Sequence, residues 1–322
     1  MSEVIASQKV AVIIPCYKVT KHILPLLEKI GSLVWRIYVV DDCCPEESGR
    51  LVQENCPDPR VVVLRNPVNL GVGGAVMTGF KQALADGADI LVKIDGDGQM
   101  DPDLLPFFLK PLVTGQADYV KGNRFYNPAD LTRMPLIRLI LNAGVSFVNK
   151  LSSGYWNIFD PTNGYLAINA KVANLLPMDK IAKRYFFESD MLFRLNLIKA
   201  VVVDIPMTAV YANESSNLKL RSQFIPFIFG HIKNTVKRIF YNYYLRDLTA
   251  GSVELLLGLF LFSFGFIFGL AKWIEGAETA ATASSGTVML AALPVILGLQ
   301  FLLSFVNNDI ASVPYEPIQG KI

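Results

Sequence analysis

The stretch ILVKIDGDGQMDP, from Ile90 to Pro102, joins an apolar run to a dense group of carboxylates. Its first part, Ile90 to Ile94, is rich in branched apolar residues and predicts a buried strand. Asp95, Asp97 and Asp101 then follow within seven residues. Like charges this close repel one another, so the group indicates a bound cation or a set of hydrogen-bond donors at the end of the strand.

Three more runs rich in valine and isoleucine precede this one, at Val10 to Ile14, Ile37 to Val40 and Val61 to Leu64. Segments of helical length separate the runs, at 20–30, 46–55 and 74–86. This alternation predicts an α/β domain with a mainly parallel, doubly wound sheet whose strands are buried on both faces. Further strands are predicted at Asp118 to Lys121, Gly164 to Ile168 and Val201 to Ile205, with helices near 134–152 and 188–199.

Polar residues follow each of the first four predicted strands. They are Pro15 to Lys18, the pair Asp41-Asp42, Arg65 to Gly74, and Asp95 to Asp101. In an open parallel sheet, ligands bind at the carboxyl ends of the strands. The four clusters are therefore expected to converge on one crevice.

Two long uncharged runs lie near the C-terminus, at Leu255 to Ala271 and Thr279 to Asn308. Each is long enough to cross a hydrocarbon core of ~30 Å as a helix of about 20 residues. We therefore expect four parts: a cytoplasmic catalytic domain at 1–218, basic amphipathic interfacial helices at 219–248, two transmembrane helices with a short extracytoplasmic loop at 249–308, and a cytoplasmic tail at 309–322.

The net charge of +2 is unevenly distributed. Residues 1–218 carry 22 Lys and Arg against 22 Asp and Glu, whereas 219–246 carry six basic residues and no acidic one. Aromatic residues are interleaved with these cations, which is typical of a helix lying in a lipid interface; an ordinary solvated helix is the alternative. Positive charge on the near side of the first span predicts a multi-pass protein of the inner (cytoplasmic) membrane with both termini cytoplasmic.

Several common classes of site are not supported by the sequence. Four cysteines without a Cys-x-x-Cys spacing, and only two histidines, argue against a zinc site or a disulfide framework. The glycine-rich loop at Gly71 to Ala75 lacks the third glycine of a dinucleotide motif, because Val76 stands there, and it does not match a P-loop. No nucleic-acid partner is expected.

The carboxylates after the fourth predicted strand are the best candidates for a cation site. Asp95 and Asp97, with the amide oxygen of Gln99, offer hard oxygen ligands suited to Mg²⁺ or Mn²⁺. Such an ion keeps open positions for phosphate oxygens. A solvated turn is the alternative, since aspartate and glycine are also common turn residues.

Several motifs follow one another along the chain: VIIPCYK at 12–18, VVDD at 39–42, the loop from Asn69 to Gly74, KIDGDGQMDP at 93–102 and GNR at 122–124. In this order they resemble glycosyltransferase family 2. More narrowly, the Asp-x-Asp-x-Gln form, DPTNG at 160–164, FESD at 187–190, SNLK at 216–219 and the two C-terminal spans resemble the polyprenyl-phosphate glycosyltransferases of the dolichol-phosphate mannose synthase type. The resemblance covers essentially the whole chain.

This resemblance implies a Rossmann-like GT-A domain and a metal-dependent inverting enzyme. The donor would be a nucleotide diphosphate sugar, a UDP- or GDP-hexose. The acceptor would be a polyprenyl phosphate, undecaprenyl or dolichyl, and the product a lipid-linked monosaccharide. A homo-oligomer is compatible with the resemblance.

The resemblance also implies roles for single residues. The nucleotide sugar would be bound by Pro15, Tyr17, Asp41, Asp42, Gly71, Asp95 and Asp97, with Asp42 accepting a hydrogen bond from the base. The divalent cation would be held by Asp95, Asp97 and Gln99, and the acceptor phosphate by Arg124, Arg138, Ser216 and Lys219. The catalytic residues would be Asp97, Arg124 and Arg138. The chain departs from the family pattern at Cys43-Cys44, where Gly-Ser is usual, and at Lys18, where Asn is usual.

Some alternatives remain open at this level. Glu188 and Asp190 are either general bases or acids favoured by the N-terminus of a helix. A processive polysaccharide synthase shares the fold but carries an Arg-Trp pair that this sequence lacks, and a catalytically inactive scaffold or sugar-nucleotide sensor is the rival of a different class. Gly265 and Gly269 mark either a contact between spans, a contact between subunits, or a chance pair.

Overall fold

The computed structural model describes residues 7–126, 136–208 and 220–322, without the side chains of 137–138 and 220–224. The chain forms two compact units, which are described separately. The first contains the residues up to Val236 together with Pro314–Ile322, and the second contains Lys237–Val313.

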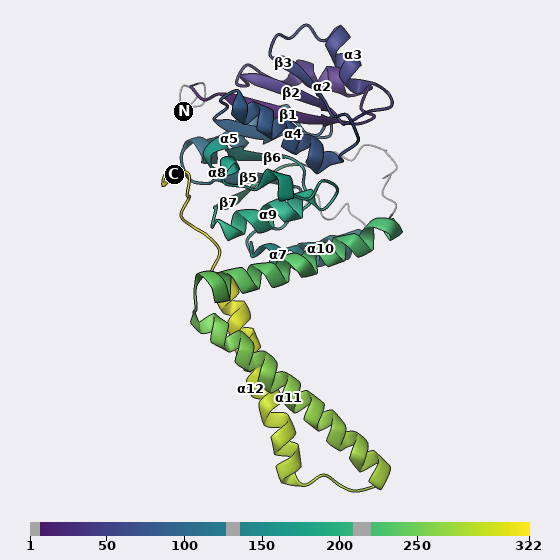
Figure 1. Ribbon diagram of the computed structural model, residues 1–322, viewed down its shortest axis with the longest axis vertical. Helices are drawn as coiled ribbons and strands as arrows, with labels where there is room; N and C mark the ends of the chain where they lie inside the picture. The colour runs from purple at the N-terminus through teal and green to yellow at the C-terminus, as the bar shows by residue number, and fades with distance from the viewer. Residues whose placement is uncertain (1–6, 127–135, 209–219) are drawn as a thin grey trace. The chain divides into compact units, whose positions relative to one another are not determined.

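A seven-stranded sheet forms the centre of the first unit, in the order β3-β2-β1-β4-β6-β5-β7 (Figure 1). The strands are β1 (Val10–Cys16), β2 (Arg36–Asp41), β3 (Val61–Arg65), β4 (Ile90–Lys93), β5 (Tyr119–Asn123), β6 (Leu166–Asn169) and β7 (Val202–Pro206). All neighbours are parallel except β6, which is antiparallel to both β4 and β5. The predicted α/β class with a mainly parallel sheet is confirmed, and the antiparallel direction of β6 was not predicted.

Helices cover the two faces of this sheet. The face that carries Val10, Val12 and Ile14 packs against α2 (Ile23–Lys29), α3 (Ser48–Asn55) and α5 (Leu105–Val113) in one continuous core. The opposite face packs against α4 (Val72–Ala85), where Gly79 lies directly against Ile13. Because β1 is buried on both faces, its sequence is continuously apolar rather than alternating. The other helices in the described part of this unit are η1 (Pro102–Leu104), α7 (Leu136–Ser153), α8 (Ala170–Asn174), η2 (Met178–Lys180), α9 (Phe187–Leu197) and most of α10 (Leu220–Phe240).

The reversed direction of β6 determines which segments meet at the functional edge of the sheet. Leu166, at the amino end of β6, pairs with Lys93 near the carboxyl end of β4 and with Lys121 of β5. The segment 160–164 that precedes β6 therefore lies at the same edge as the carboxyl ends of β4 and β5. Segments separated by about seventy residues in sequence are brought together in this way.

The C-terminal residues pack on the first unit. The backbone N–H groups of Ile318 and Gln319 donate to the carboxylate of Asp118, which is fully buried and also accepts from the N–H of Val201. The Gln319 amide donates to the carbonyl of Ala117 and accepts from Asn169. Residues 318–319 are thus bound to the rest of the first unit by a set of directed hydrogen bonds.

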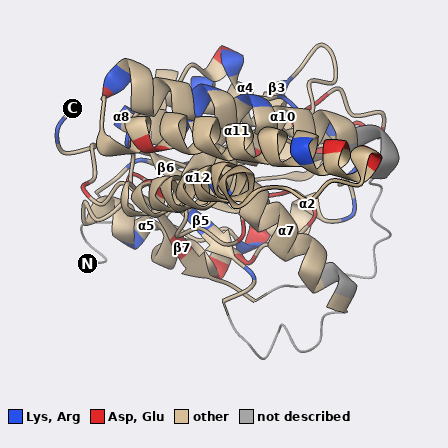
Figure 2. Ribbon diagram, turned by 90° about the horizontal axis from the view of Figure 1, so that it is seen from below, with Lys and Arg blue, Asp and Glu red and all other residues tan. Residues whose placement is uncertain are grey.

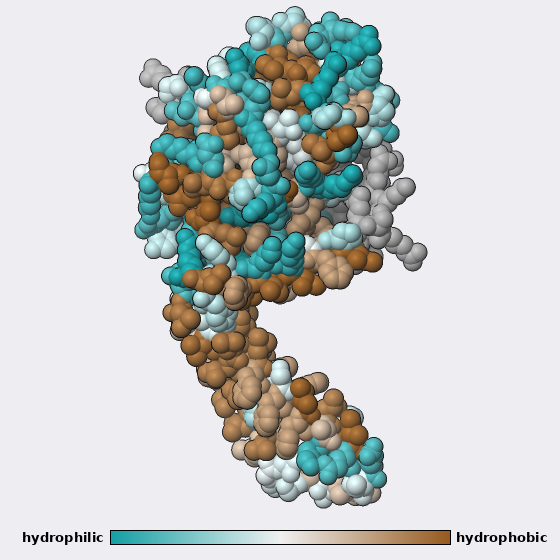
Figure 3. All heavy atoms as spheres, viewed as in Figure 1, coloured by the Kyte–Doolittle hydropathy of each residue, from teal (hydrophilic) through white to brown (hydrophobic). Residues whose placement is uncertain are grey.

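The second unit is a helical hairpin. A π-helical turn (η3, Tyr241–Arg246) precedes α11 (Ala250–Thr279) and α12 (Ser285–Ala311), and both long helices have the length and composition of membrane spans. In Figure 2, α12 carries almost no charge along its length. Figure 3 shows hydrophobic residues along the hairpin and hydrophilic residues gathered at its loop end.

Glycines bring the two helices of the hairpin close together. A Cβ at Gly265 would lie 2.6 Å from the carbonyl oxygen of Ala291, and one at Gly258 would lie 2.9 Å from Leu302. The contact predicted for Gly265 between the two apolar helices is therefore present, because this residue of α11 lies against α12. At the other end of the hairpin, Arg238 and Asp309 form a buried two-point ion pair that Tyr243 supplements.

Candidate active site

The predicted cation ligands share one turn after β4. The backbone N–H of Gln99 donates to Asp97 Oδ1 at 3.0 Å, and Gly98 has a φ of +74°, which lets the chain turn back at this point. The Asp95 side chain is 27% exposed, and Asp97 and Gln99 are also partly exposed. Among the described residues there is no group of three or more His, Cys, Asp or Glu that suits a metal. Two carboxylates and an amide nevertheless fit Mg²⁺ or Mn²⁺, which in nucleotide sites takes one or two carboxylates and fills other positions with water and phosphate.

A buried lysine lies directly behind this turn. Lys93 Nζ is 2.8 Å from Asp95 Oδ1 and 3.5 Å from Glu188 Oε1, and its side chain is 1% exposed. Burial opposes the charge of Lys93, but the attraction of Asp95 and Glu188 outweighs it and raises the pKa of the ammonium group. Burial likewise raises the pKa of Glu188, although both Lys93 and Lys121 favour its ionised form.

The loop before β6 closes around the same ion pair. A Cβ on Gly164 would overlap both Asp95 Oδ2 and Lys93 Nζ, so only glycine fits at this position without displacing them. One residue earlier, the carbonyl of Asn163 accepts a hydrogen bond from Lys121 Nζ. Burial lowers the pKa of Lys121 to about 8. Gly164 belongs to the DPTNG motif at 160–164, whereas neither lysine was predicted to have a role in the site.

One sequence signal was available for Lys93. A lysine inside the apolar run ILVKI, two residues before the first aspartate, is unusual, because lysine is almost never fully buried without a partner. That signal predicts a buried acidic partner. It does not predict which acid, because Glu188 lies 95 residues away in the chain.

The aspartate pair after β2 has a different environment. Asp41 is 6% exposed, and its carboxylate accepts from the N–H groups of Cys44 and Gly49, both at 2.7 Å. Asp42 is 3% exposed and accepts from the amide of Asn66 and from the N–H groups of Leu70 and Gly71, at 2.7–2.8 Å. Both carboxylates organise loops at the edge of the sheet, and the contact of Asp42 with a nucleotide base stays a prediction.

The other predicted nucleotide-binding residues lie at the same sheet edge. Pro15 is part of β1, and Tyr17 follows it with a side chain that is 47% exposed. Gly71 is the N-cap of α4, with a φ of +82°, and a Cβ there would meet the carbonyl of Lys183. Two departures from the family pattern contact each other, because the N–H of Lys18 donates to Cys44 Sγ at 3.1 Å.

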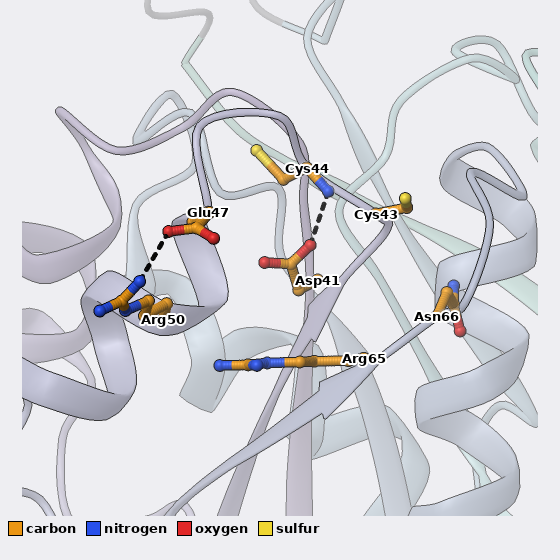
Figure 4. Close-up of a pocket in the computed structure, with 7 residues that line it drawn as sticks. All are labelled: Asp41, Cys43, Cys44, Glu47, Arg50, Arg65 and Asn66. Carbon is orange, nitrogen blue, oxygen red and sulfur yellow. Dashed lines mark hydrogen bonds and ion pairs between the residues drawn. The ribbon is translucent and has the colours of Figure 1, made fainter.

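Figure 4 shows a pocket beside these loops, between the ends of β2 and β3 and helix α3. It is lined by Asp41, Cys43, Cys44, Glu47, Arg50, Arg65 and Asn66. Its volume of about 170 Å³ is below the roughly 300 Å³ at which small-molecule sites usually begin. Residues 95–99 do not line it, and its volume is too small for a whole nucleotide sugar.

Arg124 is the described member of the predicted acceptor-phosphate group. It follows β5, and its guanidinium makes a two-point ion pair with the buried Asp160, with Nε to Oδ2 at 2.8 Å and Nη2 to Oδ1 at 2.9 Å. The Arg124 side chain remains 33% exposed. The Arg138 backbone belongs to α7, but its side chain lies outside the described part of the chain, as do Ser216 and Lys219.

The two acids of the FESD motif separate in the structure. Asp190 accepts from the N–H of Ala182, from Arg194 Nε and from Asn234 Nδ2, at 2.9–3.0 Å. It therefore joins α9 to α10 and to the loop before α9. Glu188 instead faces the sheet edge beside Lys93. Neither arrangement tests whether one of them acts as a base.

Known proteins resemble the chain over most of its length. The family model described as Glycosyl transferase family 2 matches residues 11–176. The UDP-N-acetylglucosamine--dolichyl-phosphate N-acetylglucosaminyltransferase of Methanococcus voltae is 29% identical, over 65% of this chain and 89% of that protein. The undecaprenyl-phosphate mannosyltransferase of Micrococcus luteus is 32% identical, over 63% of this chain and 84% of its own length.

A solved structure shares the fold. Glucosyl-3-phosphoglycerate synthase from Mycobacterium tuberculosis, crystallised with Mn²⁺, UDP-glucose and phosphoglyceric acid, superimposes with a TM-score of 0.53. The match covers 73% of this chain and 81% of that one, at 18% sequence identity. At this identity the likeness establishes the arrangement of the sheet and helices.

Proposed function

Because the chain belongs to glycosyltransferase family 2, and within it to the polyprenyl-phosphate type, we propose that it transfers a hexose from a UDP- or GDP-sugar to a polyprenyl phosphate at the cytoplasmic face of the inner membrane. The observation that carries the proposal is the edge of the sheet where Asp95, Asp97 and Gln99 lie in one turn. Arg124 leaves the same edge at the end of β5. Residues suited to bind a cation and an arginine suited to bind a phosphate thus lie at one edge of the domain.

The donor side rests on the partly exposed carboxylates. A Mg²⁺ or Mn²⁺ ion bound by Asp95, Asp97 and Gln99 would neutralise charge on the departing diphosphate. The protein of the same fold from M. tuberculosis was crystallised with Mn²⁺ and UDP-glucose, which agrees with this assignment. Asp42 and Gly71 hold the loop at 66–71 beside the strand ends, where the nucleoside part of the donor would bind.

The acceptor side rests on arginine. A lipid phosphate monoester carries between one and two negative charges near neutral pH, and a guanidinium binds such a group at two points. Arg124 is fixed by Asp160 yet keeps a third of its side chain exposed, so it is oriented without being enclosed. Arg138, Ser216 and Lys219 are proposed to complete this group. Inversion then follows from attack of the phosphate oxygen behind the anomeric carbon, with positioning as the main contribution of the protein.

No general base is included in this scheme. An ionised phosphate oxygen is already a nucleophile, so it has no proton for a base to remove. Glu188 is buried beside Lys93, and the carboxylate of Asp190 is occupied by three donors. We therefore assign both acids to the support of the site.

Membrane attachment is supported by two kinds of exposed apolar surface. The helices α11 and α12 have the length and apolar composition of membrane spans. In the first unit, α7 exposes Ile140, Leu141 and Phe147, and α10 exposes Phe229 and Ile232, each by more than half. Helices with such faces lie in lipid interfaces.

The orientation is supported by the bound C-terminus. Residues 318–319 donate to Asp118 in the same compact unit that contains the predicted active site. A chain that leaves this unit at 237 and returns to it at 314 crosses a membrane an even number of times. Two crossings, with the loop at 280–284 on the far side and both termini cytoplasmic, satisfy that condition.

The proposal is tested with membranes that contain the protein, a panel of labelled UDP- and GDP-hexoses, and polyprenyl phosphate. We expect one donor to yield a sugar-labelled lipid only when the polyprenyl phosphate and Mg²⁺ or Mn²⁺ are present. Replacing Arg138 with Ala should raise the KM for the lipid and leave the affinity for free nucleotide diphosphate nearly unchanged. A variant that loses nucleotide binding but keeps its lipid KM would place this arginine on the donor side.

A further inference from the structure

A line of alternating charges runs behind the proposed cation site. Glu188 comes from the first turn of α9, Lys93 from the end of β4, and Asp95 from the turn that follows. The ammonium group of Lys93 lies between the two carboxylates, 3.5 Å from Glu188 and 2.8 Å from Asp95. Lys93 in the middle is 1% exposed, whereas the side chains at the two ends are 12% exposed at Glu188 and 27% exposed at Asp95. Of the two carboxylates, that of Asp95 is the more open to solvent.

A fourth element closes the space around this line. Gly164 lies so close to Asp95 Oδ2 and Lys93 Nζ that a Cβ would overlap both atoms, and it would also contact the methyl group of Met100 at 3.0 Å. The Asp95 carboxylate is therefore enclosed by Lys93 at one oxygen and by the backbone of Gly164 at the other. Such contacts on two sides restrict the rotation of the side chain.

We propose that Lys93, held by Glu188, is a positioning residue that fixes the Asp95 carboxylate in the orientation in which it binds a divalent cation. The inference rests on the cation site of the proposed function. Residues that hydrogen-bond a metal ligand from behind reduce the ordering required when the metal binds, and their loss typically weakens metal binding about 10- to 100-fold.

The charge of Glu188 explains how the positively charged Lys93 can orient a metal ligand without repelling the metal. A lone ammonium group near the site would repel Mg²⁺ or Mn²⁺. The buried Glu188 compensates that charge, so the pair Lys93–Glu188 is neutral as a whole and acts on Asp95 mainly through a directed contact. The alternative is that Lys93 only neutralises the buried Glu188 and stabilises the fold.

The two explanations predict opposite signs for one measurement. If Lys93 only neutralises Glu188, its replacement by Met removes a positive charge near the metal, so Mn²⁺ should bind as tightly as before or more tightly. If Lys93 positions Asp95, the same replacement should raise the Kd for Mn²⁺ by about tenfold or more. The double variant Lys93→Met/Glu188→Gln keeps no uncompensated charge in the interior and should show the same weakening.

The experiment is a titration of the full-length protein in detergent with Mn²⁺, alone and with UDP or GDP. Free Mn²⁺ is followed by electron paramagnetic resonance, and the unfolding temperature of each variant is measured in parallel. Gly164→Ala should also weaken Mn²⁺ binding, because its methyl group displaces Asp95. Lys121→Met is the matched control, since Lys121 is an equally buried lysine in the same row of the sheet that bonds Asn163 instead. Its Kd should stay within about twofold of the wild type.

Each outcome decides the inference. A Kd for Lys93→Met equal to or below that of the wild type overturns it, as does an equal weakening in Lys121→Met. If Lys93→Met does not fold, the charge-balanced double variant gives the answer by the same criterion. A wild-type protein that binds no Mn²⁺ under any condition overturns the cation site together with the inference, whereas normal wild-type binding with unaffected variants overturns the inference alone.

Discussion

Two pairs of aspartates lie at the carboxyl ends of β2 and β4, the parallel strands on either side of β1, yet they have different surroundings. Asp41 and Asp42 are 6% and 3% exposed, and their carboxylate oxygens accept from five donors, two in the segment after β2 and three in the loop after β3. Asp95 and Asp97 remain partly exposed, and Asp95 contacts a buried ammonium group rather than backbone N–H groups. The first pair is built into the fold, whereas the second is presented at its surface.

This difference shows how to separate acids that shape a site from acids that act in it. A carboxylate saturated by backbone donors loses those hydrogen bonds if it turns toward a ligand, so its main effect is on the stability of its loop. A carboxylate oriented by one cation and open to solvent retains acceptor capacity for a metal. The first pair should therefore be sensitive in stability and the second in catalysis.

The largest effect is expected for Asp97→Ala. Loss of a cation ligand removes several kcal/mol of transition-state stabilisation, so transfer should fall on the order of 1000-fold or more. The unfolding temperature should change little, because Asp97 is partly exposed. Transfer of labelled sugar to polyprenyl phosphate measures the loss. Asp101→Asn, in the same acidic stretch but outside the ligand set, should keep near-normal activity, and a twofold change or less in Asp97→Ala would disprove the assignment.

For Asp42→Ala the main effect is expected on stability rather than on catalysis. The variant leaves the amide of Asn66 and the N–H groups of Leu70 and Gly71 without their buried acceptor. At about 1–3 kcal/mol for each unpaired buried group, partly relieved by water, the free energy of unfolding should fall by about 3–5 kcal/mol. Denaturant unfolding of the solubilised protein measures it. A stability loss in Asp97→Ala as large as that in Asp42→Ala would erase the distinction between the two pairs.

The buried Lys121 should make the stability of the fold depend on pH. Burial lowers the pKa of Lys121 to about 8, below the value of 10.5 expected in the unfolded chain. Between these values the unfolded chain binds a proton that the folded protein has released, so the free energy of unfolding rises with pH by about 1.4 kcal/mol per unit. Between pH 8 and 9.5 the wild type should gain about 2 kcal/mol relative to Lys121→Met. A constant difference between the two proteins over this range would contradict the pKa.

The smallest effect is expected for the C-terminal tail, which donates to a third buried carboxylate, that of Asp118. Asp118 resembles Asp41 and Asp42 in being buried and bonded to backbone donors, but two of its donors come from the C-terminal tail. Gln319→Ala removes the side-chain bonds that hold this tail and should lower the free energy of unfolding by about 1 kcal/mol. The exposed Lys321→Ala is the control. An effect of Lys321→Ala equal to that of Gln319→Ala would indicate that the tail contributes through general packing.

Much of the fold was predictable from residue patterns. The runs at 10–14, 37–40, 61–64 and 90–94 correspond to β1 to β4, because strands buried on both faces require continuous apolar sequence. The direction of β6 was not predictable, since a four-residue apolar segment has no feature that distinguishes parallel from antiparallel pairing. That direction is what brings Gly164 beside Asp95.

The sequence by itself determined the α/β class, the two apolar helices and the carboxylate turn at 95–99, because these depend on neighbours within a few residues. Only the tertiary structure decided that Lys93 lies between Asp95 and Glu188, that Asp160 holds Arg124, and that the C-terminal tail binds Asp118. Except for Lys93 and Asp95, which are two positions apart, these pairings join residues separated by 36 to 201 positions. The partner of a buried charge is chosen by the register and direction of strands, and no local pattern in the chain encodes that choice.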